Sequence, residues 1–110
     1  MYRSFKFSHA ITRLPSESVV NGLRFDDIGS PNFEQMLLDH KDYSLALSEA
    51  GAKIIELPPL QSFPDSIFVE DTVLCLSNLA ILMRPGAPSR AGEVSEIEST
   101  IKELFDNVLR

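Results

Sequence analysis

The sequence predicts a mixed α/β fold, and two kinds of apolar pattern support this prediction. Short runs rich in Ile, Val and Leu, which are typical of strands, occur at Lys53–Leu57 and Leu79–Met83. Two longer segments begin near Ser30 and Ser89, and their apolar residues recur at the spacing of one helix face. Strands that alternate with helices of this kind are typical of α/β folds.

The first half of the chain is predicted to form a strand, a helix and a second strand. Phe5–Thr12 is interpreted as a strand, and a loop with a short turn of helix follows Ser16. The helix begins at Ser30, a capping residue with proline after it, and ends at Gly51. Lys53–Leu57 is the next strand. The apolar face of the helix is predicted to consist of Phe33, Met36, Leu37, Tyr43, Leu47 and Ala50.

The second half is predicted to form a hairpin and a helix. Ser66–Leu76 has the composition of a strand, and Leu79–Met83 follows closely enough to pair with it as an antiparallel hairpin. Prolines interrupt regular structure at 85–88, and a helix then runs from Ser89 nearly to the end. Its stripe is Val94, Ile97, Ile101, Leu104, Phe105 and Val108. Because no strand is predicted after this helix, the chain resembles a repeated α/β pattern that is interrupted.

Length and composition indicate one globular domain over residues 1–110, with 44% hydrophobic and 24% charged residues. A net charge of -6 disfavours a nucleic-acid surface, which needs a basic face. The apolar runs are too short to span a bilayer, so no membrane association is expected. A single cysteine and the lack of a secretion-type leader favour a reducing cytoplasm.

Three carboxylates, Asp65, Glu70 and Asp71, form the densest polar group in the sequence. Glu70 and Asp71 lie within the predicted strand Ser66–Leu76, where a buried carboxylate is costly unless it is paired. One interpretation is that they bind a buried cation such as a guanidinium, which matches a carboxylate with two parallel hydrogen bonds. The other is that they are solvated acids at an exposed end of the strand.

The segment RPGAPSR places Arg84 and Arg90 on a stiff loop, where they could bind a carboxylate or form a solvated surface turn. Cys75 lies in an apolar run and is predicted to be a small buried residue. His9 and His40 lack the spacing of metal ligands, so no metal site is expected. No cofactor is expected either.

Three segments, FPDSIFVEDT, RPGAPSR and the earlier HAITRLPSESVVNGLR, resemble the dimethylarginine dimethylaminohydrolases, a family of guanidino-group modifying enzymes. The resemblance implies a partial pentein fold, which is an α/β propeller of ββαβ modules. The chain would be its N-terminal portion, with about two modules. Deiminases of the same superfamily have an Arg-Asp pair where this chain has Glu70-Asp71, which favours the dimethylarginine branch.

The resemblance also implies a role for each candidate site residue. Asp71 would hold the guanidinium of a methylated arginine, and Glu70 would support the catalytic histidine. Asp65 and the carbonyl of Leu23 would receive the α-ammonium, and Arg90 would bind the α-carboxylate. The family's cysteine attacks the guanidinium carbon, dimethylamine leaves, and water releases citrulline.

The catalytic histidine, a second carboxylate-binding arginine and the nucleophilic cysteine of the family are expected beyond Arg110. Residues 1–110 are therefore expected to recognise substrate without turning it over. The alternative is a truncated, non-catalytic pentein module that binds a guanidino ligand or a partner. In either case, uncovered apolar surface near Leu79–Met83 and the last helix is expected to favour a homo-oligomer.

Overall fold

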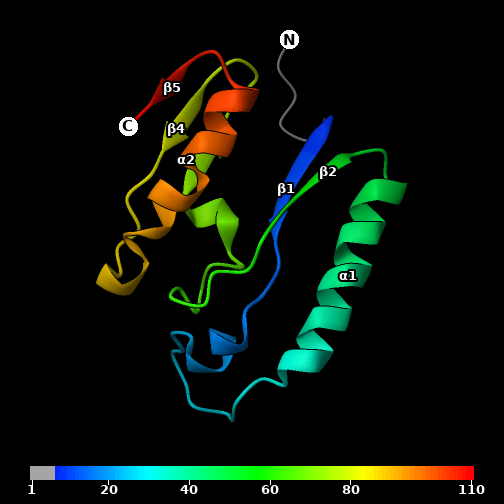
Figure 1. The fold of residues 1–110 in the computed structure, drawn as a ribbon, viewed down its shortest axis with the longest axis vertical. Coiled ribbons are helices and arrows are strands. Elements are labelled where there is room, and N and C mark those ends of the chain that lie inside the picture. The colour runs from blue at the N-terminus through cyan, green and yellow to red at the C-terminus, as the bar shows by residue number, and fades with distance from the viewer. Residues whose placement is uncertain (1–6) are drawn as a thin grey trace. The chain divides into compact units, whose positions relative to one another are not determined.

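The computed structural model describes residues 7–110 and divides the chain into two compact units, residues 1–67 and 68–110. Figure 1 shows the elements of each unit along the chain. The interpretation of residues 1–110 as a single domain stays a prediction. Among the described residues, no helix is both long and apolar enough to cross a membrane.

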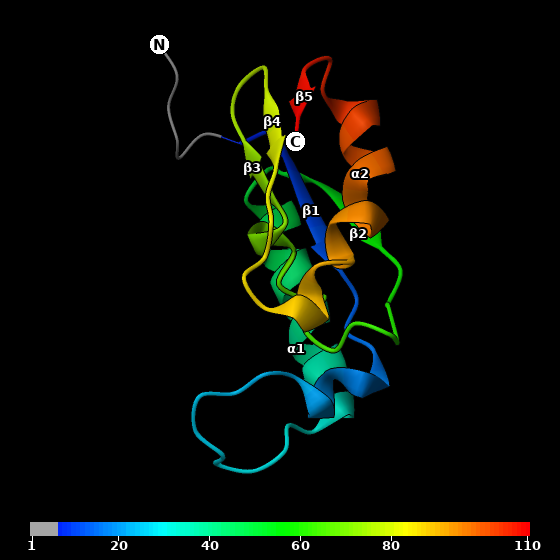
Figure 2. The same cartoon turned by 90° about the vertical axis from the view of Figure 1, so that its left-hand side faces the viewer.

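The first unit has a βαβ order in its described part. Its elements are β1 (His9–Arg13), the 3-10 helix η1 (Glu17–Asn21), α1 (Phe33–Glu49) and β2 (Lys53–Leu57). Strands β1 and β2 pair in parallel, with His9 opposite Lys53 and Arg13 opposite Leu57. A parallel pair needs a long crossover, and α1 provides it. Figures 1 and 2 show α1 running alongside this pair of strands.

The elements of the first unit match the prediction, but the start of the helix does not. Ser30 was expected to cap α1, whereas the capping residue is Asn32, whose Oδ1 accepts a hydrogen bond from the Gln35 amide at 2.9 Å. This bond satisfies one of the free amides of the first turn. Gly51 follows the helix end with a φ of 104°, which confirms the predicted stop. Strand β1 starts at His9, and Phe5 and Lys6 lie outside the described residues.

The inner face of α1 is more polar than expected. Tyr43 is 57% exposed and Ala50 is also exposed, although both were assigned to the apolar face. His40 is buried instead, and Ser44, one turn further on, is half-buried. The His40 Nε2 lies 3.6 Å from Glu56 Oε1 on β2. The helix therefore packs on the strands through a stripe that mixes polar and apolar side chains.

The second unit has the ββαβ order of the predicted module. Its elements are η2 (Val69–Asp71), β3 (Val73–Cys75), β4 (Ala80–Leu82), η3 (Pro88–Arg90), α2 (Glu93–Leu104) and β5 (Val108–Leu109). Strand β4 lies between β3 and β5, antiparallel to β3 and parallel to β5. The colours of Figure 1 show that the chain passes from β4 through α2 to β5. The core of this unit contains the buried residues Ala80, Leu82, Val94, Ile97 and Ile101.

The long strand predicted for Ser66–Leu76 is wrong. Only Val73–Cys75 is a strand, and it is preceded by turns and η2. The Thr72 hydroxyl donates to the Val69 carbonyl at 2.6 Å, and the Thr72 amide donates to the same oxygen at 3.0 Å. These local hydrogen bonds replace a strand ladder. Glu70 and Asp71 therefore belong to a tight turn of helix, and the alternation of strand faces does not apply to them.

The end of the chain also differs from the prediction. Helix α2 stops at Leu104, where the next residue, Phe105, takes extended backbone angles of -126° and 134°. Val108, which was assigned to the helix stripe, belongs to β5 and pairs with Ala80. A strand therefore does return to the sheet after the helix. Its pairing with β4 completes the ββαβ order of the second unit.

Candidate functional site

In the first unit, Asp65 is a buried residue whose carboxylate accepts hydrogen bonds from a backbone amide. Its side chain lies in a turn after Pro64, and the residue is only 8% exposed. The Leu23 amide donates to both carboxylate oxygens, at 3.1 Å to Oδ1 and 3.2 Å to Oδ2. A hydrogen bond to a charged acceptor stabilises more than a neutral one, which explains how a carboxylate stays at this buried position.

Gly22 allows Asp65 to approach the backbone closely. A Cβ atom at residue 22 would lie 2.7 Å from Asp65 Oδ1 and 3.2 Å from the Val19 carbonyl oxygen. The backbone of Gly22 has ordinary extended angles, so glycine is needed at this position for space rather than for conformation. A second link between these segments is the Ser18 amide, which donates to Gln61 Oε1 at 3.3 Å.

In the second unit, Arg90 connects two carboxylates and a carbonyl. Its Nε and Nη2 donate to the two oxygens of Glu93, each at 2.9 Å. Its Nη1 donates to Asp71 Oδ2 at 2.6 Å, and its Nη2 also donates to the Phe68 carbonyl at 3.0 Å. The pairing with Glu93 is the two-pronged geometry that suits guanidinium and carboxylate. We call Asp71, Arg90 and Glu93 the Arg90 cluster.

Burial differs across the Arg90 cluster. The side chain of Glu93 is 3% exposed and that of Arg90 is 11% exposed, whereas that of Asp71 is 52% exposed. The hydrogen bond with Glu93 raises the pKa of Arg90 above its usual value, with a further contribution from Asp71. The guanidinium therefore stays charged. With both carboxylates ionised, the cluster carries one net negative charge, and Asp71 is its accessible end.

The structure brings together one predicted pair, Leu23 with Asp65, and also places Asp71 against Arg90, a contact that the sequence did not predict. Glu70 is exposed and makes no hydrogen bond with another described residue. Glu93 was missed by the sequence prediction. Its signal was the spacing to Arg90, three residues earlier, at the first turn of a helix, where an acidic residue is favoured.

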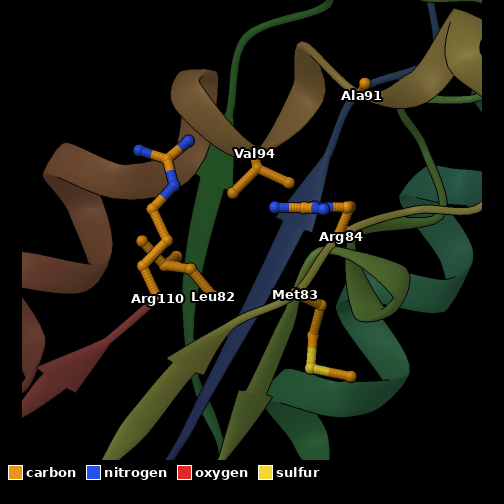
Figure 3. A pocket seen from close by; sticks show the side chains of 6 residues that line it. All are labelled: Leu82, Met83, Arg84, Ala91, Val94 and Arg110. Atoms are coloured by element: carbon orange, nitrogen blue, oxygen red, sulfur yellow. The ribbon is translucent and has the colours of Figure 1, made fainter.

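The other arginine of the RPGAPSR loop, Arg84, has different surroundings. Arg84 lines a cavity of about 340 Å³, which Figure 3 shows with its lining residues Leu82, Met83, Arg84, Ala91, Val94 and Arg110. None of the predicted substrate-binding residues lines this cavity. Arg84 is exposed and forms no hydrogen bond or ion pair with another described residue. Of the two arginines, only Arg90 belongs to a carboxylate cluster.

Cys75 is exposed, so its assignment as a buried residue is wrong. It is the last residue of the short strand β3, which pairs only with β4 among the described residues. Partial burial nevertheless raises the pKa of the Cys75 thiol, which disfavours the reactive thiolate. Among residues 7–110, no group of three or more His, Cys, Asp or Glu side chains could hold a metal ion.

Comparison with known proteins finds relatives in the predicted family. The chain is 46% identical over 99 residues to N(G),N(G)-dimethylarginine dimethylaminohydrolase of Pseudomonas aeruginosa, a match that covers 90% of this chain and 39% of the relative. It is 33% identical over 102 residues to the protein of the same name from Streptomyces coelicolor, covering 86% and 37%. No family model matches the chain.

Solved structures agree with these relatives. The Pseudomonas aeruginosa enzyme, as a cysteine-to-serine variant complexed with citrulline, superposes with a TM-score of 0.93 at 45% identity, covering 96% of this chain and 42% of that one. A histidine-to-glycine variant of a dimethylarginine dimethylaminohydrolase, as an adduct with S-methyl-L-thiocitrulline, gives the same TM-score at 44% identity. The chain is thus related in sequence and in fold to the dimethylarginine dimethylaminohydrolases, as its motifs predicted, and it spans about two fifths of their length.

Proposed function

We propose that this chain supplies the substrate-holding part of a hydrolase that converts methylated arginine to citrulline and dimethylamine. One observation carries the proposal: Asp65 and Asp71, the two carboxylates assigned to the substrate's cations, are each fixed by a hydrogen-bond donor. The relatives bear the name of this activity, and a solved relative holds citrulline.

Each residue takes a defined role in the proposed reaction. Asp71 holds the guanidinium, because Arg90 occupies its Oδ2 while its Oδ1 makes no hydrogen bond with another described residue. Asp65 and the carbonyl of Leu23 receive the α-ammonium. Arg90 binds the α-carboxylate, which requires the ligand to share this guanidinium with Asp71 and Glu93. Glu70 is exposed and supports a histidine from outside residues 1–110.

The nucleophile in this proposal is not Cys75. A nucleophilic cysteine needs a depressed pKa, and partial burial raises that of Cys75. The thiol and the histidine come from residues outside this chain's 110. The solved relatives in which a cysteine or a histidine was replaced, and which hold citrulline or a thiocitrulline adduct, support a role for both residue types in that family.

Localisation and assembly belong to the same proposal. We expect the protein to act in the cytoplasm, where a thiolate nucleophile stays reduced. Self-association is expected through exposed apolar side chains of the second unit. These are Phe68, Leu74, Leu76, Met83, Leu104 and Leu109. Ala80 and Leu82 are buried beneath α2, so the surface near β4 is smaller than the sequence suggested.

The activity is tested by exchanging a segment between relatives. The matching part of the Pseudomonas aeruginosa enzyme is replaced by residues 7–110 of this chain, and citrulline formation from dimethylarginine is measured. The hybrid is expected to release citrulline, and residues 1–110 alone are expected to release none above background. Cys75→Ser is expected to change neither result.

The alternative, a non-catalytic module that binds a guanidino ligand or a partner, predicts a different outcome. A hybrid that is folded by circular dichroism and gel filtration but does not turn over dimethylarginine would favour this module. Turnover by residues 1–110 alone, lost on Cys75→Ser, would contradict both the exclusion of Cys75 as the nucleophile and the need for residues from outside the chain.

A further inference from the structure

Glu93 has no role in the substrate-holding set proposed above, yet it is the most buried carboxylate of the Arg90 cluster. Its side chain is 3% exposed and takes a two-pronged grip on Arg90, with both N–H···O distances at 2.9 Å. A buried ion pair is weak evidence for stability in itself, because desolvation offsets much of the attraction. This geometry therefore invites a functional explanation.

The charge of the cluster depends on Glu93. Arg90 Nη1 and Asp71 Oδ2 lie 2.6 Å apart. The opposite charges of these two side chains alone would cancel and leave little attraction for a cation. Glu93 adds one negative charge on the buried side of the guanidinium. The cluster then presents a net negative charge through Asp71, whose side chain is 52% exposed.

The geometry of the cluster depends on Glu93 as well. With Nε and Nη2 held by Glu93, the guanidinium plane is fixed, and Nη1 is directed at Asp71 Oδ2. Nη2 is further fixed by the Phe68 carbonyl at 3.0 Å. Asp71 is the last residue of the short helix η2, and the Asp71 amide donates to the Phe68 carbonyl at 3.2 Å. One oxygen of Asp71 is thereby held in place while the other can accept from a ligand.

We infer that Glu93 is a positioning residue of a guanidinium-binding cluster: it fixes Arg90 against Asp71, and its charge makes the cluster selective for a cation over a neutral isostere. This inference rests on the proposed function for the identity of the ligand. Beyond the proposed function, Glu93 is a buried residue that does not touch the ligand, and its charge is expected to make binding selective for a cation.

The test uses the 110-residue chain and two small probes that share a shape, N,N-dimethylguanidinium and the neutral N,N-dimethylurea. Binding is followed through the Asp71 carboxyl carbon signal, and the order of Arg90 is followed through its Nε–H signal. Glu93→Gln removes the charge and one acceptor. Its matched control is Glu103→Gln, on the same helix, where the side chain is exposed and makes no hydrogen bond with a described residue.

We expect Glu93→Gln to lower the preference for the cation over the urea about tenfold, as removal of one charge at short range in a partly screened site predicts. Exchange of the Arg90 Nε–H proton should become faster. Glu103→Gln should change neither signal. Glu93→Asp provides a second variant that keeps the charge but shortens the side chain, so it should retain the preference while the Arg90 signal broadens.

The possible results separate the two proposals. An Arg90 Nε–H signal and a cation preference that are both unchanged by Glu93→Gln would overturn the inference and leave the proposed function standing. An equal loss of affinity for both probes would also overturn it, because a purely structural role predicts that pattern. If the unaltered chain showed no preference for the cation at Asp71, the proposed function would be contradicted, and the charge selectivity with it.

Discussion

Asp65 and Asp71 are assigned to the two cationic groups of the same substrate, but the chain holds them in contrasting ways. Asp65, in the first unit, is 8% exposed and accepts from a backbone amide in a space that only a glycine leaves open. Asp71, in the second unit, has a side chain that is 52% exposed and accepts from an arginine that a buried glutamate fixes. Asp65 thus accepts from main chain, and Asp71 accepts from a charged side chain.

The difference shows which kind of change each carboxylate tolerates. A backbone donor keeps its position whatever side chain surrounds it, so the contact between Leu23 and Asp65 depends on chain geometry and on the space at Gly22. The Arg90 cluster depends on ion pairs between three side chains, and removal of Arg90 leaves the buried charge of Glu93 without this partner. Substitutions in the second unit should therefore have larger effects than comparable substitutions in the first.

The largest expected effect comes from Arg90→Ala. It leaves the Glu93 carboxylate, whose side chain is 3% exposed, without its ion-pair partner. We expect a loss of about 3–5 kcal/mol in the free energy of unfolding of the second unit. Urea unfolding combined with amide exchange across residues 68–110 measures it. Arg84→Ala, from the same loop but exposed, is the control and should cost no more than about 0.5 kcal/mol. Equal costs for the two arginines would remove the contrast between the units.

A smaller loss is expected from Asp65→Ala. The Leu23 amide loses a charged acceptor that binds it through both oxygens. A hydrogen bond to a charged group contributes about 1.5–3 kcal/mol, and exposure of Leu23 lets water replace part of it. The free energy of unfolding should fall by less than in Arg90→Ala. Asp26→Ala, which changes an exposed acid three residues after Leu23, should be neutral.

Gly22→Ala should also destabilise the first unit, by about 1–3 kcal/mol, because the added Cβ overlaps the Asp65 carboxylate. The double variant with Asp65→Ala separates crowding from a backbone effect. If the overlap is the cause, Gly22→Ala should cost less when Asp65 is already alanine. Strictly additive losses in urea unfolding would show that the close approach to Asp65 is unimportant.

The smallest effect concerns Cys75. Because partial burial raises the pKa of its thiol, less thiolate is present at a given pH than in a free cysteine. Alkylation by iodoacetamide should be slower than that of N-acetylcysteine at neutral pH, and its pH midpoint should lie higher. A midpoint below that of the free thiol would contradict the raised pKa and the exclusion of Cys75 as the nucleophile.

Much of the fold follows from local patterns in the sequence. The Ile-rich run Lys53–Leu57 is a strand with the predicted bounds, and the hairpin of β3 and β4 forms where two apolar runs lie close together. Glycine after α1 marks its end because Gly51 takes a positive φ. These elements are determined by residues within a few positions of one another, so sequence patterns identify them.

The predictions from sequence are wrong where side-chain hydrogen bonds or strand pairing determine the structure. Thr72 and Val69 form a local turn that breaks the predicted strand, and the return of β5 to β4 depends on pairing across the second unit. Of the candidate site, Asp65, Asp71 and Arg90 were predicted through the resemblance, and their roles stay predictions. Glu93 was not predicted, because composition alone does not distinguish a buried ion-pair partner from a solvated acid on a helix.

We propose that Asp65 and Asp71 recognise different parts of one substrate. The most direct test is the discrimination, as a ratio of kcat/KM values, between dimethylarginine and its analogue without the α-amino group, in the hybrid enzyme carrying residues 7–110. Asp65→Asn should lower this ratio by about 10-fold to 100-fold, the loss of a charged hydrogen bond, while turnover of the analogue is kept. Asp71→Asn should reduce turnover of both substrates and leave the ratio unchanged. A ratio that Asp65→Asn does not alter would contradict the account.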